Sequence, residues 1–372
     1  MNAVKTIIKW IALILVVIIV LQVCRQFFLE EELAFRNDLY RMVKQSFPDA
    51  NQKVQTLYGL HPYVREGKPA DKTDTDAAGR PGAGSVPGPA VVLIHGLDEP
   101  GRVWWNLSPV LDRKGYPVLL MSYPNDQQIT DSARFMLEAL ATYDFGSHPS
   151  GSAAGIVLIG HSMGGLVARE MLTRPELDYG GKVSAGSVPK VSGLIMVGTP
   201  NHGAQLARFR IVMEIREQIL NLLEEDTHWL MGVLDGTGAA GLNLLPGSQF
   251  LTGLNSRPHA PVTDYHVITG MISPWPFRDE FKKTPGKHLS DNGTAGAGIV
   301  GNLLHNVSEI LGDGLVTAGS TRLDHVPYTL VQGNHLTMIR NFSRKSTRTP
   351  AAIPVIVDLL DTHVSRKSMA GS

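Results

Sequence analysis

The chain has 372 residues, with 34 basic and 34 acidic side chains. Its zero net charge offers no electrostatic footprint for nucleic acid, so we expect no nucleic-acid partner. Cys24 is the only cysteine, which excludes disulfides, cysteine-based metal sites and a thiol nucleophile from the rest of the chain. Residues 90–372 are long enough to form one large domain with a substantial core.

Residues 1–26 predict a membrane anchor. Ile7 to Cys24 is apolar apart from Lys9 and Gln22, and as a helix it would rise about 27 Å, enough for a thin hydrocarbon core. Basic residues precede it and a run of glutamates follows it. The positive-inside tendency therefore predicts a single pass through the inner (cytoplasmic) membrane, with a cytoplasmic N-terminus and a periplasmic catalytic domain. Two alternatives stay open, cleavage as a signal peptide and lipidation at Cys24.

The next two segments connect this anchor to the main domain. Residues 27–66 predict an amphipathic helical segment, since Phe28, Phe35, Leu39 and Met42 recur at helical spacing. Residues 67–89 are rich in Gly, Pro, Ala, Asp and Lys and have no apolar periodicity, which predicts a flexible linker.

Strand and helix signals alternate through residues 90–372. Apolar runs predict strands at 91–94, 118–123, 156–160, 191–197, 265–269 and 328–331, and helices at 104–113, 130–142, 164–173 and 354–364. This alternation predicts an α/β fold with a mostly parallel central sheet flanked by helices. Active sites in such sheets gather beyond the carboxyl ends of the strands.

Gly160 to Gly164 reads Gly-His-Ser-Met-Gly, between a predicted strand and a predicted helix. This is the Gly-x-Ser-x-Gly pattern of a nucleophile elbow in its strand-turn-helix setting. β-Carbons at the two glycines would clash with the neighbouring strand and helix. We therefore predict that Ser162 is a catalytic nucleophile.

A serine nucleophile needs a base, and the base needs an acid to orient it. His335 follows the last predicted strand and precedes a predicted helix, and Asp313 lies in a glycine-rich turn. The chain order Ser162, Asp313, His335 is the one expected of this architecture. The nearest competitors, which lack either the strand-end placement or the flanking sequence, are Asp324, His325, Asp291 and His288.

The oxyanion hole needs two backbone amides. The amide of Met163, directly after the nucleophile, is one candidate. The amide of Leu97 is the other, because it follows the first predicted strand of the domain and Gly96 lets the backbone turn there.

A cap insertion is predicted at about residues 204–262. Leu206 to Leu234 has the pattern of a long amphipathic helix or helical pair, with an apolar face that favours an acyl chain over a charged substrate. Whether it is a moving lid or a permanently packed helix stays open.

Several motifs in the expected order together resemble the α/β-hydrolase superfamily, and within it the bacterial lipases and esterases. They are Ile94-His95-Gly96-Leu97, Gly160-His161-Ser162-Met163-Gly164-Gly165, Gly198-Thr199-Pro200-Asn201-His202-Gly203, Leu245-Pro246-Gly247-Ser248-Gln249-Phe250-Leu251, Gly312-Asp313-Gly314-Leu315-Val316 and Asn334-His335-Leu336. The resemblance implies an eight-stranded sheet, a helical cap and an acyl-enzyme at Ser162. The two antiparallel strands that usually precede the His-Gly strand are hard to find here.

These observations predict a membrane-anchored serine hydrolase that cleaves carboxylic esters or lipids, with no cofactor and no metal. Three alternatives stay open: an acyltransferase, a thioesterase or amidase that uses the same triad, and an inactive membrane-anchored scaffold on a hydrolase fold. The natural ester, the acyl length and the oligomeric state are not determined by the sequence.

Overall fold

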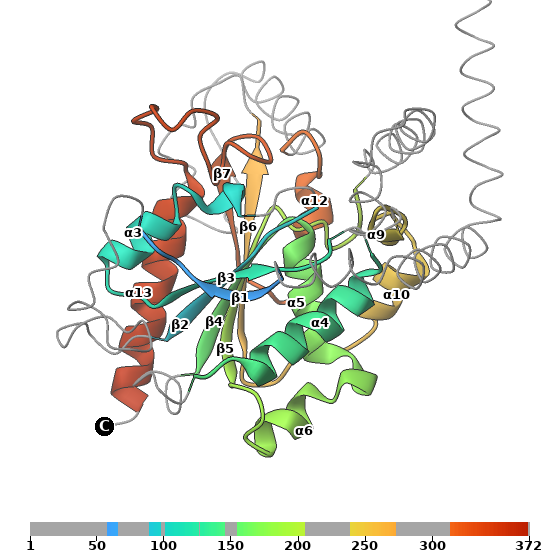
Figure 1. Cartoon of the computed structure of the whole chain (residues 1–372). Helices are drawn as coiled ribbons and strands as arrows, with labels where there is room; N and C mark the ends of the chain where they lie inside the picture. Colours follow the sequence, from blue (N-terminus) through green and yellow to red (C-terminus); the bar gives the residue numbers. More distant parts are fainter. Residues whose placement is uncertain are drawn as a thin grey trace, which may run out of the picture.

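The computed structural model describes residues 58–65, 89–97, 101–125, 127–145, 155–204, 239–272 and 313–370 (Figure 1). The predicted anchor at 1–26 and the predicted cap helix at 206–234 lie outside these residues, as does the predicted linker apart from its last residue. Among the helices of the described ranges, none is both long and apolar enough to cross a bilayer.

The described strands form one sheet in the order β1-β3-β2-β4-β5-β6-β7. The six strands from β2 to β7 run parallel to one another. Their bounds are Ala90–Ile94 (β2), Val118–Ser122 (β3), Ile156–His161 (β4), Val191–Val197 (β5), Asp264–Met271 (β6) and Tyr328–Gln332 (β7). The apolar runs of the sequence therefore give the strands expected of them, within one or two residues at their ends.

β1, at Gly59–Pro62, corrects part of the sequence prediction. It lies in the segment 27–66 that was predicted to be helical, and it pairs antiparallel with β3, Leu60 opposite Met121. Four residues are too few to display strand alternation, and their backbone partners lie far along the chain. The pairing with the free edge of β3 therefore decides the conformation. β1 is thus an antiparallel strand that precedes the His-Gly strand, and its local sequence pattern does not reveal it.

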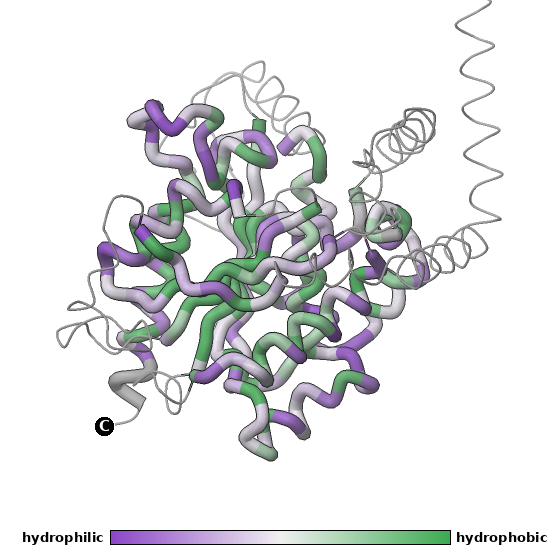
Figure 2. The backbone as a smooth tube through the Cα atoms, viewed as in Figure 1, coloured by the Kyte–Doolittle hydropathy of each residue, from purple (hydrophilic) through white to green (hydrophobic). Residues whose placement is uncertain are grey.

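Helices cover both faces of the sheet (Figure 1), and its central strands are hydrophobic (Figure 2). The strands divide their side chains between two cores. Along β2, Val92 and Ile94 face one core, whereas Val91 and Leu93 face the other. The first core is closed by α4 (Ile129–Thr142) and α5 (Met163–Thr173). The second is closed by α3 (Ser108–Arg113) and α13 (Ala352–Ala370). Apolar strands covered on both faces are typical of parallel sheets.

The helix predicted at 104–113 is divided in the structure. A 3-10 turn, η1, covers Arg102–Trp104, and α3 begins only at Ser108 with Pro109 in its first turn. Proline lacks an amide hydrogen and is tolerated at a helix start but not within a helix, so a new helix begins there.

Short elements connect these layers. They are η2 (Pro175–Leu177), α6 (Tyr179–Ser184), α9 (Ala239–Asn243), α10 (Gln249–Asn255) and α12 (Ala318–Thr321). α9 and α10 lie within the predicted cap insertion, in its described part. The helix expected after His335 is replaced by successive turns at 335–339, which lead into an exposed loop.

Candidate active site

Ser162 has a backbone conformation that L-amino acids rarely adopt, with φ 52° and ψ −126°. It lies between the end of β4 and the first residue of α5, where the chain turns sharply. Its amide donates a hydrogen bond to the carbonyl of Val197 at 2.8 Å, which ties the turn to the end of β5. Conformations of this kind cost about 1–3 kcal/mol and persist where the surrounding structure fixes them, often at functional sites.

Two glycines allow this turn. A β-carbon at Gly160 would overlap the backbone of Gly165, and one at Gly164 would overlap the carbonyl of Ile94 in β2. The reason proposed from the sequence for these glycines therefore holds. The helix and the two strands approach one another too closely for any side chain.

Asp313 and His335 form a buried pair. His335 Nδ1 lies 2.6 Å from Asp313 Oδ2, and the two side chains are 8% and 1% exposed. The other carboxylate oxygen, Oδ1, accepts hydrogen bonds from the amides of Leu315 (2.9 Å) and Val316 (2.8 Å). Because the carboxylate is an acceptor, the proton between the pair belongs to Nδ1 of the imidazole. In the neutral form of this imidazole the lone pair is on Nε2, as a general base requires.

The backbone also connects these two residues. The His335 amide donates to the Asp313 carbonyl at 2.9 Å, so the loops after β6 and β7 are held together. A β-carbon at Gly198 would lie 3.2 Å from Asp313 Oδ2 and 3.3 Å from His335 Cε1. Gly198 follows Val197, the acceptor of the Ser162 amide. The structure thus brings the three residues that the sequence singled out to one edge of the sheet.

His161 is a contact to this site that sequence reasoning missed. Its Nε2 lies 3.0 Å from the carbonyl oxygen of His335, and the two rings are 4.8 Å apart between centroids. The carbonyl can only accept, so His161 Nε2 carries a hydrogen. Burial, with a smaller contribution from the nearby His335, lowers the pKa of His161 to about 3. In the sequence, His161 is only a variable position of the elbow pattern, so only its place beside Ser162 could have drawn attention to it.

The turn after β2 lies against Ser162. A β-carbon at Gly96 would lie 2.8 Å from Ser162 Cβ and 3.4 Å from its Oγ. Leu97 is the next residue, and Met163 is the first residue of α5. The two residues chosen as oxyanion donors therefore flank Ser162 from different elements.

His95 and Tyr123 hold this turn. Their rings stack with centroids 4.5 Å apart, and the Tyr123 hydroxyl donates to the His95 carbonyl at 2.6 Å. His95 Nδ1 lies 2.7 Å from the Gly96 carbonyl. Burial lowers the pKa of His95 to about 4. A neutral, buried imidazole thus fixes the backbone on which the predicted oxyanion donor lies.

Two of the four competing residues, Asp324 and His325, are not placed at this edge. Asp324 and His325 are exposed and precede β7, whereas His335 follows it. Asp291 and His288 lie outside the described residues. Within the described part of the chain, no group of His, Cys, Asp and Glu has the arrangement of a metal site.

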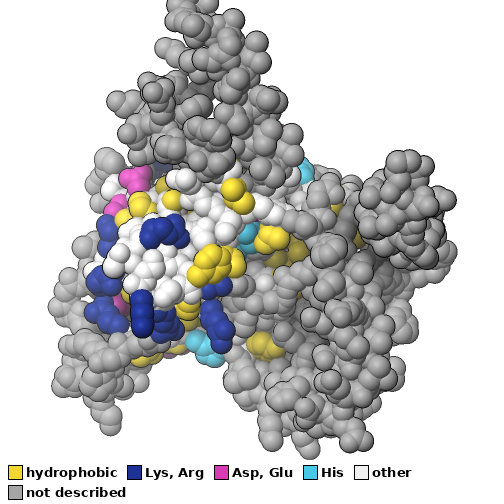
Figure 3. Space-filling view, turned by 90° about the horizontal axis from the view of Figure 1, so that it is seen from above, with side chains coloured by type: hydrophobic (Ala, Val, Ile, Leu, Met, Phe, Trp, Pro, Cys, Tyr) yellow, Lys and Arg dark blue, Asp and Glu magenta, His cyan; other side chains and the backbone are white. Residues whose placement is uncertain are grey.

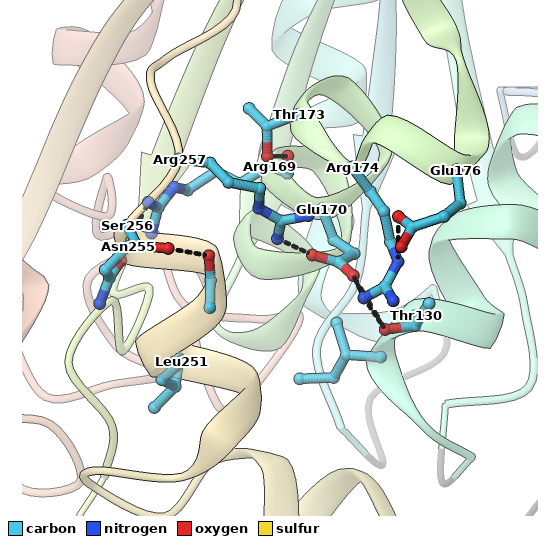
Figure 4. A network of polar contacts seen from close by, with 12 residues as sticks. Thr130, Arg169, Glu170, Thr173, Arg174, Glu176, Leu251, Asn255, Ser256 and Arg257 are labelled. Carbon is cyan, nitrogen blue, oxygen red and sulfur yellow. Dashed lines mark hydrogen bonds and ion pairs between the residues drawn. The ribbon is translucent and has the colours of Figure 1, made fainter.

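A buried polar network holds α5 against its neighbours (Figure 4). Glu170 of α5 is fully buried. Its Oε1 accepts from the Thr130 hydroxyl of α4 at 2.8 Å and from Arg174 Nη1 at 2.9 Å. Its Oε2 accepts from Arg257, which follows α10. Carboxylates are buried at tolerable cost only with such partners.

The neighbouring Arg169 extends this network. Its Nη1 donates to Asn201 Oδ1 at 2.8 Å, and its Nη2 donates to Asn255 Oδ1 at 3.0 Å. Asn201 in turn donates to the Thr321 carbonyl of α12 at 2.6 Å. The network therefore joins α5 to α4, to α10 and to the loop after β5. Nothing in the sequence spacing of these residues predicted it.

The chain resembles known proteins in its sequence pattern and in its fold. The model of the alpha/beta hydrolase family matches residues 91–304, more than half of the chain. No curated protein matches the sequence.

Among solved structures, the chain is similar to a lipase of Bacillus licheniformis in its mature form, with 18% identity and a TM-score of 0.47 over 81% of this chain and 97% of that one. It is similar to a metagenomic carboxyl esterase, with 18% identity and a TM-score of 0.50 over 82% and 83%. The phospholipase PlaB from Legionella pneumophila has 16% identity and a TM-score of 0.47 over 75% of this chain and 60% of that one.

Proposed function

The chain belongs to the alpha/beta hydrolase family, and from this premise we propose that it is a serine hydrolase that cleaves carboxylic esters. In this proposal Ser162 is the nucleophile, His335 the general base and Asp313 the residue that orients it. The backbone amides of Leu97 and Met163 are the oxyanion donors. No cofactor or metal takes part.

The observation that carries the proposal is the buried pair of Asp313 and His335 beside a strained serine. The 2.6 Å contact and the two amides on the second carboxylate oxygen keep Asp313 fixed as an acceptor. A structural ion pair would not require a serine with φ 52° at the same edge of the sheet. Strain of that kind is retained where it orients a reacting group.

The reaction would proceed through a covalent ester. His335 Nε2 takes the proton of Ser162 Oγ as this oxygen attacks the carbonyl carbon, and the negative charge develops on the carbonyl oxygen. The two amides stabilise this oxyanion. The protonated His335 then gives its proton to the departing alcohol. Water repeats the sequence on the acyl-enzyme, which releases the acid and restores Ser162.

The proposed substrate is an ester with an apolar acyl chain. The support comes from the apolar face of the predicted insertion at 206–234, which would line an acyl pocket as part of the cap. We further propose that the N-terminal segment at 1–26 anchors the enzyme in the inner membrane, with the catalytic domain on the periplasmic side. The amino-acid pattern of that segment is the support for this proposal.

Substitution of the nucleophile tests the proposal. Ser162→Ala is expected to lower the turnover of p-nitrophenyl butyrate by about 10³-fold or more. It should also abolish labelling by a fluorophosphonate probe. The matched control is Ser184→Ala, at an exposed serine of α6, which should keep both activities.

Near-normal hydrolysis by Ser162→Ala, with a far-ultraviolet circular dichroism spectrum like that of the unmodified chain, would contradict the assignment. Product analysis with and without an alcohol acceptor then separates hydrolysis from acyl transfer. A series of p-nitrophenyl esters of increasing length identifies the preferred acyl chain.

A further inference from the structure

Residues 340–348, which we call the basic loop, connect the turns after His335 to α13. The eight consecutive residues at 342–349 are all exposed, between the buried Asn341 and the buried Pro350. The loop begins only five residues after His335, at the edge of the sheet that carries the proposed active site.

Hydrogen bonds at its base give the basic loop a defined shape. Asn341 is 2% exposed and its amide donates to Asn106 Oδ1 at 2.8 Å. Its side chain donates to the Arg348 carbonyl at 2.7 Å and accepts from Arg348 Nε at 3.1 Å. Arg348 Nη2 also donates to the Thr337 carbonyl at 2.6 Å. The two ends of the loop are thus joined, and the residues between them protrude.

The loop exposes an aromatic ring. Phe342 is 66% exposed, although it directly follows the buried Asn341. Single exposed apolar side chains are common and need no explanation by themselves. Here, however, the exposed ring is the only apolar residue between Asn341 and Pro350, and it lies among cations.

Four cations surround this ring in the sequence: Arg340, Arg344, Lys345 and Arg348. The guanidinium groups of Arg340 and Arg344 lie 5.1 Å and 5.3 Å from the centroid of the same Trp105 ring, so two of these charges are held near one another. No acidic residue occurs at positions 325–357. Figure 3 looks down on this edge of the molecule, where Lys and Arg side chains gather with hydrophobic ones.

We propose that the basic loop docks on a bilayer that contains anionic phospholipids, with Phe342 in the interface and the cations at the lipid phosphates. Aromatic rings favour the boundary between headgroups and acyl chains, and Lys and Arg are attracted to anionic leaflets. The inference also rests on the proposed function, because docking here would bring the edge of the site that carries His335 toward a surface of acyl esters.

The net charge of the chain favours an anionic bilayer over a nucleic acid, the other anionic partner that a basic loop could bind. The whole chain has zero net charge and a pI of about 7.2, whereas nucleic-acid binding domains carry extended basic surfaces. One exposed ring with cations on both sides of it in the sequence matches the small footprint of an interfacial loop.

The test measures the loop itself, because the predicted anchor at 1–26 would hold the full chain on any vesicle. Ser343→Cys, in a Cys24→Ser background, gives one thiol for a fluorophore. The full chain is reconstituted into vesicles of phosphatidylcholine alone or with about 30% phosphatidylglycerol, each with a nitroxide lipid. We expect quenching at least twofold stronger with phosphatidylglycerol.

Two variants identify the groups responsible. Arg344→Glu with Lys345→Glu should abolish the difference between the two lipid mixtures, and Phe342→Ser should weaken the quenching in the anionic one. The charge-matched control is Arg113→Glu with Lys182→Glu, at exposed residues away from the loop, which should behave like the unmodified chain.

Equal quenching in both mixtures, quenching in neither, or quenching that survives the loop double variant would each overturn the proposal. If the loop instead bound a protein partner or a second copy of the chain, lipid alone would cause no quenching. That result is one of the outcomes that overturn the proposal. Ser162→Ala in the labelled chain should quench normally. Failure of the ester hydrolase assignment is therefore measured separately, by hydrolysis of soluble p-nitrophenyl butyrate.

Discussion

His161 connects β4 to the loop that carries His335. It is the last residue of β4, directly before Ser162, and its Nε2 donates to the His335 carbonyl at 3.0 Å. Trp104 packs edge-on against the same ring, with centroids 6.3 Å apart. A buried donor of this kind costs about 1–3 kcal/mol to remove, because the carbonyl is left without its partner.

His161→Phe keeps a ring of similar size and removes the donor. We expect kcat for p-nitrophenyl butyrate to fall about tenfold or more with little change in KM, because His335 would lose a contact that positions its loop. His161→Gln, which keeps an amide donor, should recover part of the loss. Steady-state kinetics of the two variants measure this. Equal kcat in the unmodified chain and in His161→Phe would show that the contact does not position His335.

At the residue scale, the sequence alone selects Ser162 but does not predict the role of its neighbour His161. Ser162, Asp313 and His335 follow strands or lie in glycine turns, so local pattern and chain order suffice to select them. The role of His161 depends on a partner 174 positions away. No local pattern encodes that contact, since it arises only when the loop after β7 lies against the end of β4.

Glu170 is the centre of the contacts that hold α5 against its neighbours. Glu170→Ala would leave Arg257 and Arg174, which are 17% and 34% exposed, without their shared carboxylate. Removing one partner of a buried ion pair typically costs about 3–5 kcal/mol. We expect a loss of that order in the free energy of unfolding, measured by urea denaturation.

An exposed ion pair of the adjacent helix is the control for this measurement. Arg134 and Asp131 of α4 are 2.6 Å apart, with side chains 52% and 46% exposed. Solvent screens such pairs, so Arg134→Ala should cost less than about 1 kcal/mol. Similar losses in the two variants would mean that the network around Glu170 does not stabilise the packing of α5.

At the scale of elements, the sequence predicts what short-range physics decides. The apolar runs of β4 and β5 and the periodicity of α4 give their bounds to within a residue. The sequence does not reveal β1 because its partner β3 is remote. It does not reveal the break before α3 because an apolar pattern runs through Pro109, which starts a new helix. The sequence also does not predict the polar network that links Glu170 to Arg257, because these residues are remote from each other along the chain.

The whole molecule should lose stability in mild acid because two histidines are buried in their neutral form. The pKa values of His161 and His95 are lowered to about 3 and about 4, chiefly by burial, from 6.5 in the unfolded chain. Between these values the unfolded chain binds more protons than the folded one. The contribution of these two histidines to the free energy of unfolding is therefore fully present above pH 6.5 and is lost as the pH falls below it.

Each histidine contributes a slope of about 1.4 kcal/mol per pH unit in that window, so the loss from pH 6.5 to pH 5 is about 2 kcal/mol for each. Urea denaturation at pH 7, 6 and 5 measures it, above the range in which carboxylates titrate. His161→Phe lacks one of these groups, so its stability, though lower at pH 7, should decline less steeply. A stability that is constant from pH 7 to pH 5, or equal slopes in the two chains, would mean that His161 does not resist protonation in the folded state.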